Sequence, residues 1–464
     1  MTSGPAPVVY KFGGTSLGDG ARIAHVADLV VEGPRPLAVV VSAMAGVTDL
    51  LQGLALADTS TRAAVDEVAG ALSERHLAAL DALHPEGKAA GETHERARRD
   101  LAGRIERLVE DATGQTGLTG RMRADAILST GEDLSQRLLL AALEVRDLAA
   151  AAVDSRSVVI TDARFGRAVP DRSGTREACA ARLLPVLRDG TVAVLQGFVG
   201  ATPDGHTTTL GRGGSDFSAA ILGGALDAET VHIWTDVQGV LSGDPRQVDA
   251  PRLLPEIGFE ELVELAWAGA RVIHPVAAKW AIAEGAPLRI RDTFHPEHPG
   301  TRVLHDARGA SEIAAITTKR GVALIKVRSH PVALPYGFLA RVFGVLGRHR
   351  LEVDLVATSH SSTAFTIDDR AHLSEVEAEL GTFADVDVRR ELATITVVGR
   401  GLMAEPGVDG QVFTVVGATR VHLVSQASDV SLSLVVDAEE ADAVTRKLHD
   451  ALIGPEGTRA ETTP

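Results

Sequence analysis

The sequence predicts an α/β fold with a mostly parallel sheet, followed by two smaller α+β modules in tandem. Two observations support this prediction. Up to about residue 300, short β-rich runs alternate with helical stretches, which is the pattern of an α/β layer fold. Beyond that point a weak repeat recurs at a spacing of about 70 residues. The chain of 464 residues is long enough for two or three domains that each bury a core.

The first domain is expected to span residues 1–303 and to end at the Pro- and His-rich stretch HPEHPGTRV. Short β-branched runs bounded by Gly or Pro indicate its buried strands. These runs are VVYKF at 8–12, LAVVVSAM at 37–44, TVAVLQGF at 191–198 and VHIWTDV at 231–237. A helical stripe between the second and third runs predicts a helical excursion outside the sheet, over residues 60–115. Its apolar members are Val65, Val68, Leu72, Leu80 and Leu83.

Two stretches after residue 303 share one rhythm of helix, strand and strand, and each follows a β-rich run, VALIKV or ATITVV. Phe343 of the first stretch corresponds to Phe413 of the second, and Val353 corresponds to Val421. Each unit closes in a helical segment, of which EADAVTRKLHDAL is the clearest. We therefore expect two βαββα modules, at 304–388 and 389–464; chance similarity between two α+β stretches is the alternative.

Composition excludes several classes of protein. With 46 basic and 62 acidic side chains the net charge is −16, which argues against a sequence-independent nucleic-acid binder. No run reaches the roughly 18 apolar residues of a membrane helix, and the N-terminus has no secretory signal pattern. The single Cys179 excludes an intrachain disulfide framework and a multi-cysteine metal site. These features are those expected of a cytoplasmic protein.

The first motif with chemical content is KFGGTS, at the end of the first predicted strand. Gly13 and Gly14 lack a Cβ, so their N–H groups can approach an anion closely. Lys11 would direct its ammonium to the same place, although in the common phosphate loop the lysine follows the glycines. A plain Gly-Gly turn is the alternative interpretation.

The second motif is TTTLGRGGSDFSAA, at 207–220, where a glycine loop opens a helix. Ser215 or Asp216 occupies the expected N-cap position. Arg212 offers a fork that suits a carboxylate beside a helix N-terminus that favours anions. Simple capping by Asp216 and a surface charge at Arg212 are the alternatives. A third motif, WTDVQGVLSGDPR at 234–246, places acids at a strand end where open α/β sheets bind ligands.

Together with five further stretches, these motifs resemble the aspartate kinases of the amino acid kinase family, and the resemblance covers the chain nearly end to end. The five stretches are VVVSAMAGVTDLL, LSTGEDLSQRLL, RFGRAVPD, LQGFVG and GARVIHP. The resemblance is to the lysine-sensitive monofunctional type. It implies a three-layer αβα sandwich followed by two ACT modules. It also implies phosphorylation of the β-carboxylate of L-aspartate by ATP, with Mg²⁺ carried by the ATP and not by a protein cage. This reaction is the first step toward lysine, threonine and methionine.

The resemblance assigns roles to individual residues. Lys11 would stabilise the transferring phosphoryl group, and Asp216 would orient Lys11 or help to place the metal. The backbone N–H groups of Gly13 and Gly14 would donate hydrogen bonds to the phosphates. Arg212 and Ser215 would bind the carboxylates of the amino acid, and Glu132 would pair with its ammonium; Glu132 could instead be an acid at a helix N-terminus. The other matching substrate positions are Ser42, Thr48, Phe198 and Thr209. The nucleotide would be bordered by Thr235, Asp236, Asp244, Arg246 and Arg271. His274 is expected to be structural.

Several positions depart from the family pattern. Leu241 replaces a tyrosine, which removes an aromatic contact from the nucleotide side, so weaker ATP binding is expected. Arg271 replaces a lysine, which keeps the charge but exchanges a point charge for a planar fork. In the two ACT modules, four positions match those that bind a lysine effector in the family: Gly337, Asp354, Thr358 and Ser359. Val332 replaces a methionine, His360 a glutamate and Ala427 a glycine. We therefore expect inhibition by lysine to be weakened or lost. Threonine is the other candidate effector, and the ACT modules predict a homodimer or a higher homo-oligomer.

Two alternatives to the aspartate kinase remain. One is a specialised paralogue that phosphorylates another β-carboxyl amino acid. The other is a catalytically silent amino-acid sensor, which would be free to lose Lys11 and Asp216. Both residues are present, which favours an active kinase.

Overall fold

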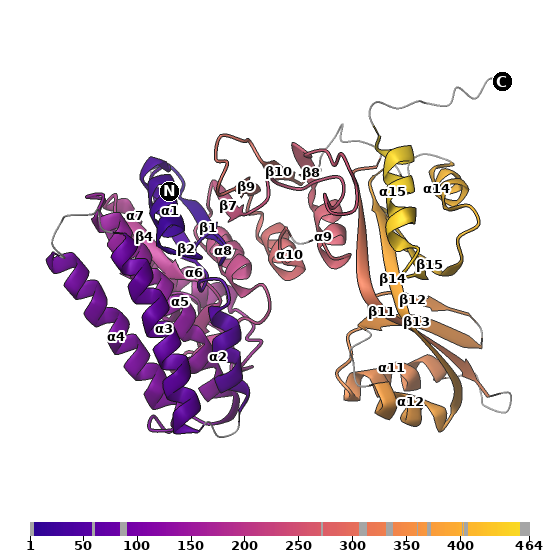
Figure 1. Cartoon of the computed structure of the whole chain (residues 1–464), viewed down its shortest axis with the longest axis horizontal. Helices are drawn as coiled ribbons and strands as arrows, with labels where there is room; N and C mark the ends of the chain where they lie inside the picture. Colours follow the sequence, from indigo (N-terminus) through magenta and orange to yellow (C-terminus); the bar gives the residue numbers. More distant parts are fainter. Residues whose placement is uncertain are drawn as a thin grey trace. The chain divides into compact units, whose positions relative to one another are not determined.

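A computed structural model describes residues 4–57, 61–83, 91–270, 272–305, 313–330, 337–359, 361–368, 373–400, 402 and 407–454 (Figure 1). The chain forms two compact units. The first comprises Met1–Val240 and Val272–Asp306, and the second comprises Leu241–Arg271 and Ala307–Pro464. The segment 241–271 thus groups with the C-terminal unit, although it lies inside the first domain as predicted from the sequence. No helix among the described residues is long and apolar enough to cross a membrane.

The first unit is built on a sheet of strand order β3-β4-β2-β1-β7-β9-β10. Its strands are β1 Val8–Phe12, β2 Leu37–Val41, β3 Ala150–Val153, β4 Val192–Gln196, β7 Thr230–Thr235, β9 Leu288–Asp292 and β10 Thr301–Leu304. Neighbours from β3 to β9 pair in parallel, and β10 pairs antiparallel with β9. Every residue of β1, β2 and β4 is buried, because helices cover both faces of a parallel sheet. The predicted parallel sheet is confirmed.

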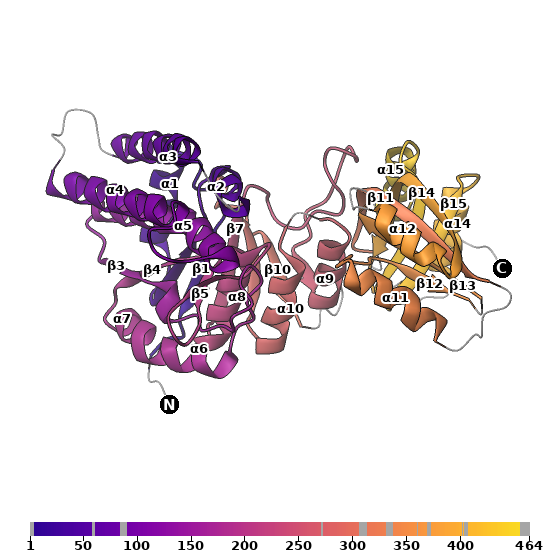
Figure 2. The ribbon, with the colours of Figure 1, turned by 90° about the horizontal axis from the view of Figure 1, so that it is seen from below.

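Helices cover both faces of this sheet, so the unit is a three-layer sandwich (Figure 2). One face carries α1 Gly20–Glu32, α2 Val47–Leu56, α3 Arg62–Ala82, α4 Glu92–Ala112 and α5 Gly120–Glu144. The other carries α6 Arg172–Ala178, the π-helical turn Cys179–Leu183, α7 Leu184–Arg188, α8 Gly214–Ala225 and α10 Pro275–Glu284. Short elements between them are the 3₁₀ turn Ser155–Ser157, β5 Val199–Ala201 and β6 Thr207–Thr209. The stretch predicted to be a helical excursion contains α3 and α4, and Val65, Leu72 and Leu80 of its stripe are fully buried.

The second unit contains an antiparallel sheet of strand order β12-β13-β11-β14-β16-β15. Its elements are β8 Glu256–Gly258, α9 Phe259–Trp267, β11 Ala315–Ser329, α11 Phe338–Arg348, β12 Val356–Thr358, β13 Ser362–Asp368, α12 Leu373–Gly381, β14 Ala384–Val398, α14 Val408–Val416, β15 Val421–Ser428, β16 Ser431–Asp437 and α15 Ala441–Leu452. From β11 to α15 the order βαββα occurs twice. The two predicted α+β modules are confirmed.

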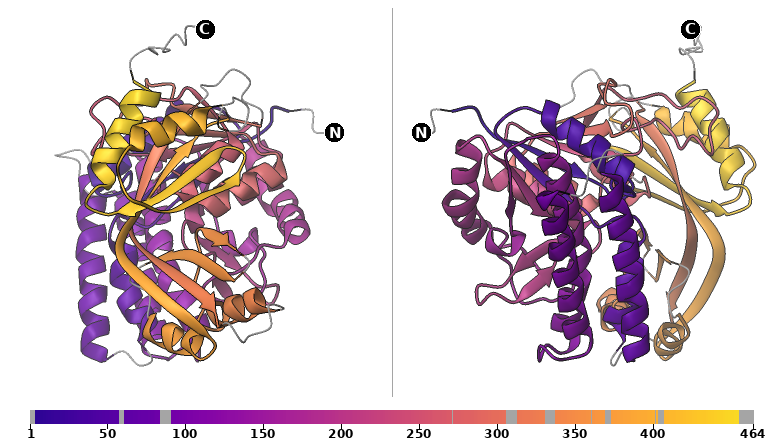
Figure 3. Two further views of the ribbon diagram at one scale, coloured as in Figure 1. Left: turned by 90° about the vertical axis from the view of Figure 1, so that its right-hand side faces the viewer. Right: turned by 60° about the vertical axis from the view of Figure 1, so that its left-hand side comes forward.

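The long strands β11 and β14 pair along their length and serve both modules (Figure 3). Ala323, Ile325 and Val327 of β11 pack with α11 and α12, whereas Ile316 packs with α14 and α15. In β14 the order is reversed: Ala384 joins the first core and Ile395 joins the second. Ile316, which the sequence assigns to the first module, therefore lies in the core of the second.

The register of the parallel sheet aligns the strand ends that carry the predicted motifs. Trp234, Phe12, Val41 and Gln196 are adjacent across the sheet. The next residue in each strand is therefore placed at one carboxyl edge, where α/β sheets bind ligands. These residues are Thr235, Gly13, Ser42 and Gly197.

Candidate active site

Lys11 and Asp216 form an ion pair at the carboxyl edge of the sheet. Lys11 Nζ lies 2.6 Å from Asp216 Oδ1, and the two side chains are only 11% and 14% exposed. Asp216 Oδ2 also accepts a hydrogen bond from the backbone N–H of His274, at 3.2 Å. The predicted structural role of His274 thus has a geometric basis, because its backbone helps to hold the carboxylate that faces Lys11.

The start of α8 differs from the expectation that Ser215 or Asp216 caps it. The N-cap is Gly213, whose φ of 67° is left-handed, and no side chain caps the helix. Asp216 is therefore the third residue of the helix. The prediction was wrong because two consecutive glycines let the helix begin earlier than a side-chain cap would.

Close backbone approach explains both glycines. A Cβ on Gly213 would lie 2.1 Å from the Cβ of His274, and one on Gly214 would lie 2.4 Å from Cδ2 of Phe198. Ser215 in turn packs against Gly197, where a Cβ would lie 2.6 Å from the Cβ of the serine. The loop is thus fixed between the 197–198 turn and His274, and it carries exposed Arg212 at its tip.

Glu132 is a buried carboxyl group with one unsatisfied oxygen. It lies in the middle of α5, so the alternative of an acid at a helix N-terminus is wrong. Its Oε1 accepts from the N–H of Ala43 at 3.2 Å, and its Oε2 has no hydrogen-bond partner among the described residues. Burial raises the pKa of Glu132 to about 8. An acid in this environment favours a cationic partner that would stabilise its ionised form.

The GGTS loop packs tightly against the segment after β2. A Cβ on Gly14 would lie 2.8 Å from the carbonyl oxygen of Ala43, and Gly14 O accepts from the N–H of Ala45 at 3.1 Å. The N–H of Gly13 already donates to the carbonyl of Trp234, at 3.3 Å, so a phosphate contact there would replace this long bond. Ser42 lies half-buried beside the loop, and Thr48 is exposed in the first turn of α2.

Thr209 is held by an acid that sequence reasoning missed. Its hydroxyl donates to Asp125 Oδ1 at 2.8 Å, and its backbone N–H donates to Oδ2 at 2.9 Å. Asp125 Oδ2 also accepts from the N–H of Gly166, at 2.9 Å. Thr209 is fully buried, so its hydroxyl positions β6 in this structure. No sequence signal distinguishes Asp125 from the other acids of α5.

The predicted nucleotide residues lie in both units. In the first unit, Thr235 Oγ1 donates to Asp236 Oδ1 at 3.2 Å, at the end of β7. In the second unit, Arg246 Nη2 pairs with Asp244 Oδ2 at 2.6 Å. Arg271 lies outside the described residues.

The predicted effector residues belong to the second unit. Asp354 Oδ2 lies 2.5 Å from Lys319 Nζ, an ion pair that sequence reasoning did not anticipate. Thr358 ends β12, the Ser359 hydroxyl lies 2.7 Å from that of Ser362, and Gly337 caps α11 with a φ of 83°. Val332 and His360 lie outside the described residues.

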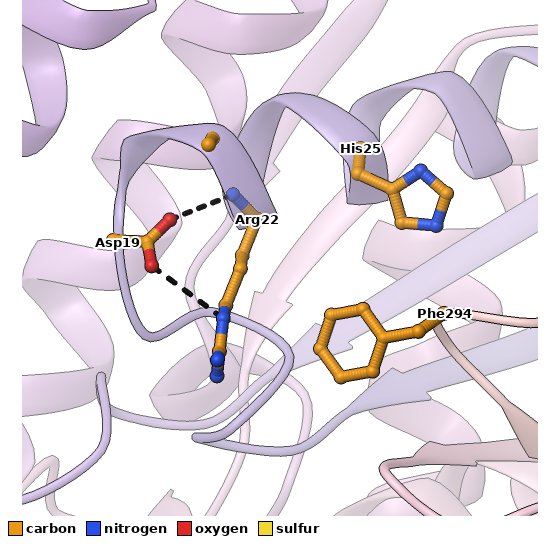
Figure 4. A pocket seen from close by; sticks show the side chains of 5 residues that line it. Asp19, Arg22, His25 and Phe294 are labelled. Carbon is orange, nitrogen blue, oxygen red and sulfur yellow. Dashed lines mark hydrogen bonds and ion pairs between the residues drawn. The ribbon is translucent and has the colours of Figure 1, made fainter.

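A shallow pocket of about 420 Å³ lies beside the first turn of α1 (Figure 4). Asp19 caps the helix by accepting from the N–H of Arg22 at 2.9 Å, and the guanidinium of Arg22 lies 5.2 Å from the ring centre of Phe294. Arg22 also donates to the carbonyl of Thr15, at 2.7 Å. The pocket therefore adjoins the GGTS loop, but none of the predicted site residues lines it.

Comparisons with known proteins identify the family of the chain. Residues 6–292 match the amino acid kinase family, and residues 395–452 match an ACT domain. The chain is 36% identical to lysine-sensitive aspartokinase 3 of Escherichia coli, over 96% of this chain and 99% of that protein. It is 31% identical to the aspartokinase of Chlamydia muridarum, over 97% of each chain. The E. coli aspartokinase III structure with aspartate and ADP superposes with a TM-score of 0.84 at 34% identity, covering 96% of this chain and 99% of that one. The form with lysine and aspartate gives a TM-score of 0.81 at 35% identity, with the same coverage.

Proposed function

The chain belongs to the amino acid kinase family, and from that membership we propose that it is an aspartokinase. It transfers the γ-phosphoryl group of ATP to the β-carboxylate of L-aspartate. The bond between the γ-phosphorus and the β,γ-bridging oxygen breaks, and a carboxylate oxygen of aspartate forms the new bond to phosphorus. The products are ADP and 4-phospho-L-aspartate. The carboxylate is already ionised at neutral pH, so the acceptor needs no general base.

The observation that carries the proposal is the ion pair of Lys11 with Asp216. Phosphoryl transfer brings two anions together, so the protein mainly positions them and neutralises charge. The ammonium of Lys11 supplies this positive charge at the strand end, and Asp216 holds it in place. A silent sensor would have no need of a lysine kept so nearly buried.

Three side chains would bind the amino acid acceptor. Arg212 and Ser215, on the loop before and within α8, bind its carboxylates. The ammonium binds Glu132, whose Oε2 has no hydrogen-bond partner among the described residues. Ser42, Thr48, Phe198 and Thr209 complete the proposed substrate positions, with Thr209 acting through its bond to Asp125.

ATP would enter as its magnesium complex, with Mg²⁺ as part of the substrate. The phosphates lie toward Lys11, Gly13 and Gly14, and Thr235 and Asp236 border the nucleotide. The resemblance to the family is the basis for proposing nucleotide roles for Asp244, Arg246 and Arg271 as well. Asp216 is engaged by Lys11 and by the N–H of His274, which supports an ion held mainly by phosphate oxygens.

The second unit would regulate the kinase and join copies of the chain. Phe343 and Phe413 occupy corresponding positions on α11 and α14, and they are 37% and 42% exposed, which supports an assembly through these modules. The relative from E. coli is described as lysine-sensitive. In this chain Lys319 already pairs with Asp354, one of the proposed effector positions, so this carboxylate already has a cationic partner, which supports weak sensitivity to lysine.

A hydroxamate assay tests the proposal. The purified chain is incubated with MgATP, hydroxylamine and aspartate, glutamate or methylaspartate, each with and without lysine and threonine. We expect hydroxamate to form with aspartate and depend on ATP. Preference for another β-carboxyl amino acid would instead identify the specialised paralogue. Absence of signal above the hydroxylamine background with every acceptor would refute the kinase.

A further inference from the structure

The turn between β9 and β10 brings together two imidazoles and a carboxylate. Ligand atoms of His295, Glu297 and His298 all lie within 4.8 Å of one another. His295 Nδ1 lies 3.3 Å from Glu297 Oε1, and His298 Nε2 lies 3.8 Å from the same oxygen. In a tetrahedral zinc site with bonds of about 2.0–2.1 Å, ligand atoms are roughly 3.3 Å apart. Small side-chain rotations would therefore bring three ligands onto one ion.

Prolines and hydrogen bonds from neighbouring arginines restrict the backbone of this turn. Two prolines restrict φ within the sequence HPEHPG. Both of their carbonyls accept hydrogen bonds from arginines of β9: Arg289 Nε donates to Pro299 O at 2.9 Å, and Arg291 Nη2 donates to Pro296 O at 2.5 Å. The N–H of His298 also donates to the carbonyl of His295, at 3.1 Å. A turn fixed in this way loses little conformational freedom when a ligand binds.

We propose that His295, Glu297 and His298 form a binding site for a divalent transition metal ion of the Zn²⁺, Co²⁺ and Ni²⁺ class. Imidazole nitrogen suits these ions, whereas Mg²⁺ prefers oxygen ligands and octahedral geometry. The three side chains are 58%, 65% and 43% exposed, so water completes the coordination. The site is independent of the proposed kinase reaction and of the ion that accompanies ATP, because none of its three residues is assigned to that reaction.

The test uses the full-length chain without an affinity tag. Zn²⁺ affinity and stoichiometry are measured by competition with a chromophoric chelator in the presence of millimolar Mg²⁺, and Co²⁺ is added separately to record its visible absorption. We expect one equivalent of Zn²⁺ to bind and Mg²⁺ not to displace it. His298→Ala and Glu297→Gln should each weaken binding by at least the roughly 10- to 100-fold that loss of an outer-shell partner costs.

His206→Ala is the matched control, because His206 is a half-buried histidine of the same unit that pairs with a single acid, Asp204, at 2.9 Å. The control should bind Zn²⁺ like the unaltered chain, and circular dichroism should show that all variants are folded. Equal Zn²⁺ affinity in the unaltered chain, His298→Ala and Glu297→Gln would overturn the site, as would displacement by millimolar Mg²⁺.

Discussion

The ammonium of Lys11 lies 2.6 Å from the carboxylate of Asp216, although the two residues are far apart in the sequence. Lys11 belongs to β1, the strand at the centre of the parallel sheet, and Asp216 to the first turn of α8. The backbone N–H of His274, at the start of α10, holds the same carboxylate. One ion pair thus depends on a strand and two helices being in place together.

Replacement of Lys11 by alanine should lower kcat much more than it raises KM for aspartate. If the ammonium acts on charge that develops during transfer, its loss should cost about 10²- to 10³-fold in kcat, the range for one electrostatic group. Steady-state kinetics with both substrates varied give this comparison. Lys447→Ala, which removes an exposed lysine of α15, is the control and should change neither constant. Equal losses in kcat and in aspartate affinity would mean that Lys11 acts in binding and not in the transition state.

Binding of aspartate should depend on pH through Glu132. Burial raises the pKa of this carboxyl to about 8, so the free protein holds it mostly neutral at pH 7. An ammonium beside it favours the ionised form, so aspartate binding releases a proton and its KM should fall as the pH rises from 6 to 8. Glu132→Gln should raise KM and abolish this dependence. Glu229→Gln, at an exposed site, should leave the profile unchanged, and a profile that is equally steep in Glu132→Gln would contradict the assignment.

The same shift predicts how stability varies with pH. The folded pKa of Glu132 is above the ordinary value of 4.5, so between about pH 4.5 and 8 the folded state binds more of this proton than the unfolded state. This contribution to the free energy of unfolding is complete below that window and is lost as the pH rises through it. Glu132→Gln should therefore gain stability relative to the unaltered chain as the pH rises from 5 to 8. Urea unfolding at several pH values measures the difference, and a constant difference would contradict the burial of an ionisable group here.

Gly214→Ala should disturb the loop that carries Arg212. The added Cβ would lie 2.4 Å from Cδ2 of Phe198 and 3.0 Å from its Cα, so the backbone must shift. We expect a loss of about 1–3 kcal/mol of stability from overpacking, with a raised KM for aspartate. Thermal unfolding and kinetics together test this. Gly53→Ala, in α2 where a Cβ would meet nothing within 4 Å, should instead be neutral or stabilising.

Lys319→Met should increase sensitivity to lysine. The substitution keeps an unbranched side chain but removes the ammonium 2.5 Å from Asp354, leaving that carboxylate available to a free amino acid. Lysine titration in the kinase assay should give weak inhibition of the unaltered chain and stronger inhibition of the variant. Lys326→Met, elsewhere on β11, is the control. Half-inhibition of the unaltered chain at submillimolar lysine would refute the expectation that its response is weakened.

Much of the fold was predictable because its signals are local. The strands VVYKF and LAVVV are uninterrupted apolar runs, and the repeated βαββα order appears in the sequence as a spacing of about 70 residues. That one half of β11 and one half of β14 each pack in the core of the other module was not predictable. Each half of β11 has the same β-rich character, and only the pairing with β14 determines which helices it packs against.

The candidate site was predictable wherever residues lie beside glycine-rich turns, as Lys11, Arg212 and Asp216 do. Asp125 was missed because its three hydrogen bonds reach 41 and 84 residues along the chain and leave no local pattern. Side-chain capping preference predicts the wrong N-cap for α8, because close packing of Gly213 on His274 and of Gly214 on Phe198 decides where this helix begins.

The shared long strands also bear on how the second unit is assembled during folding. A polypeptide released after the first βαββα segment would hold the part of β11 around Ile316 without β14 and α15 to cover it. Neither module can complete its core without strand residues of the other. The pair should therefore fold late in synthesis and unfold in a single cooperative transition. A recombinant fragment that ends at α12 should consequently expose apolar surface and aggregate.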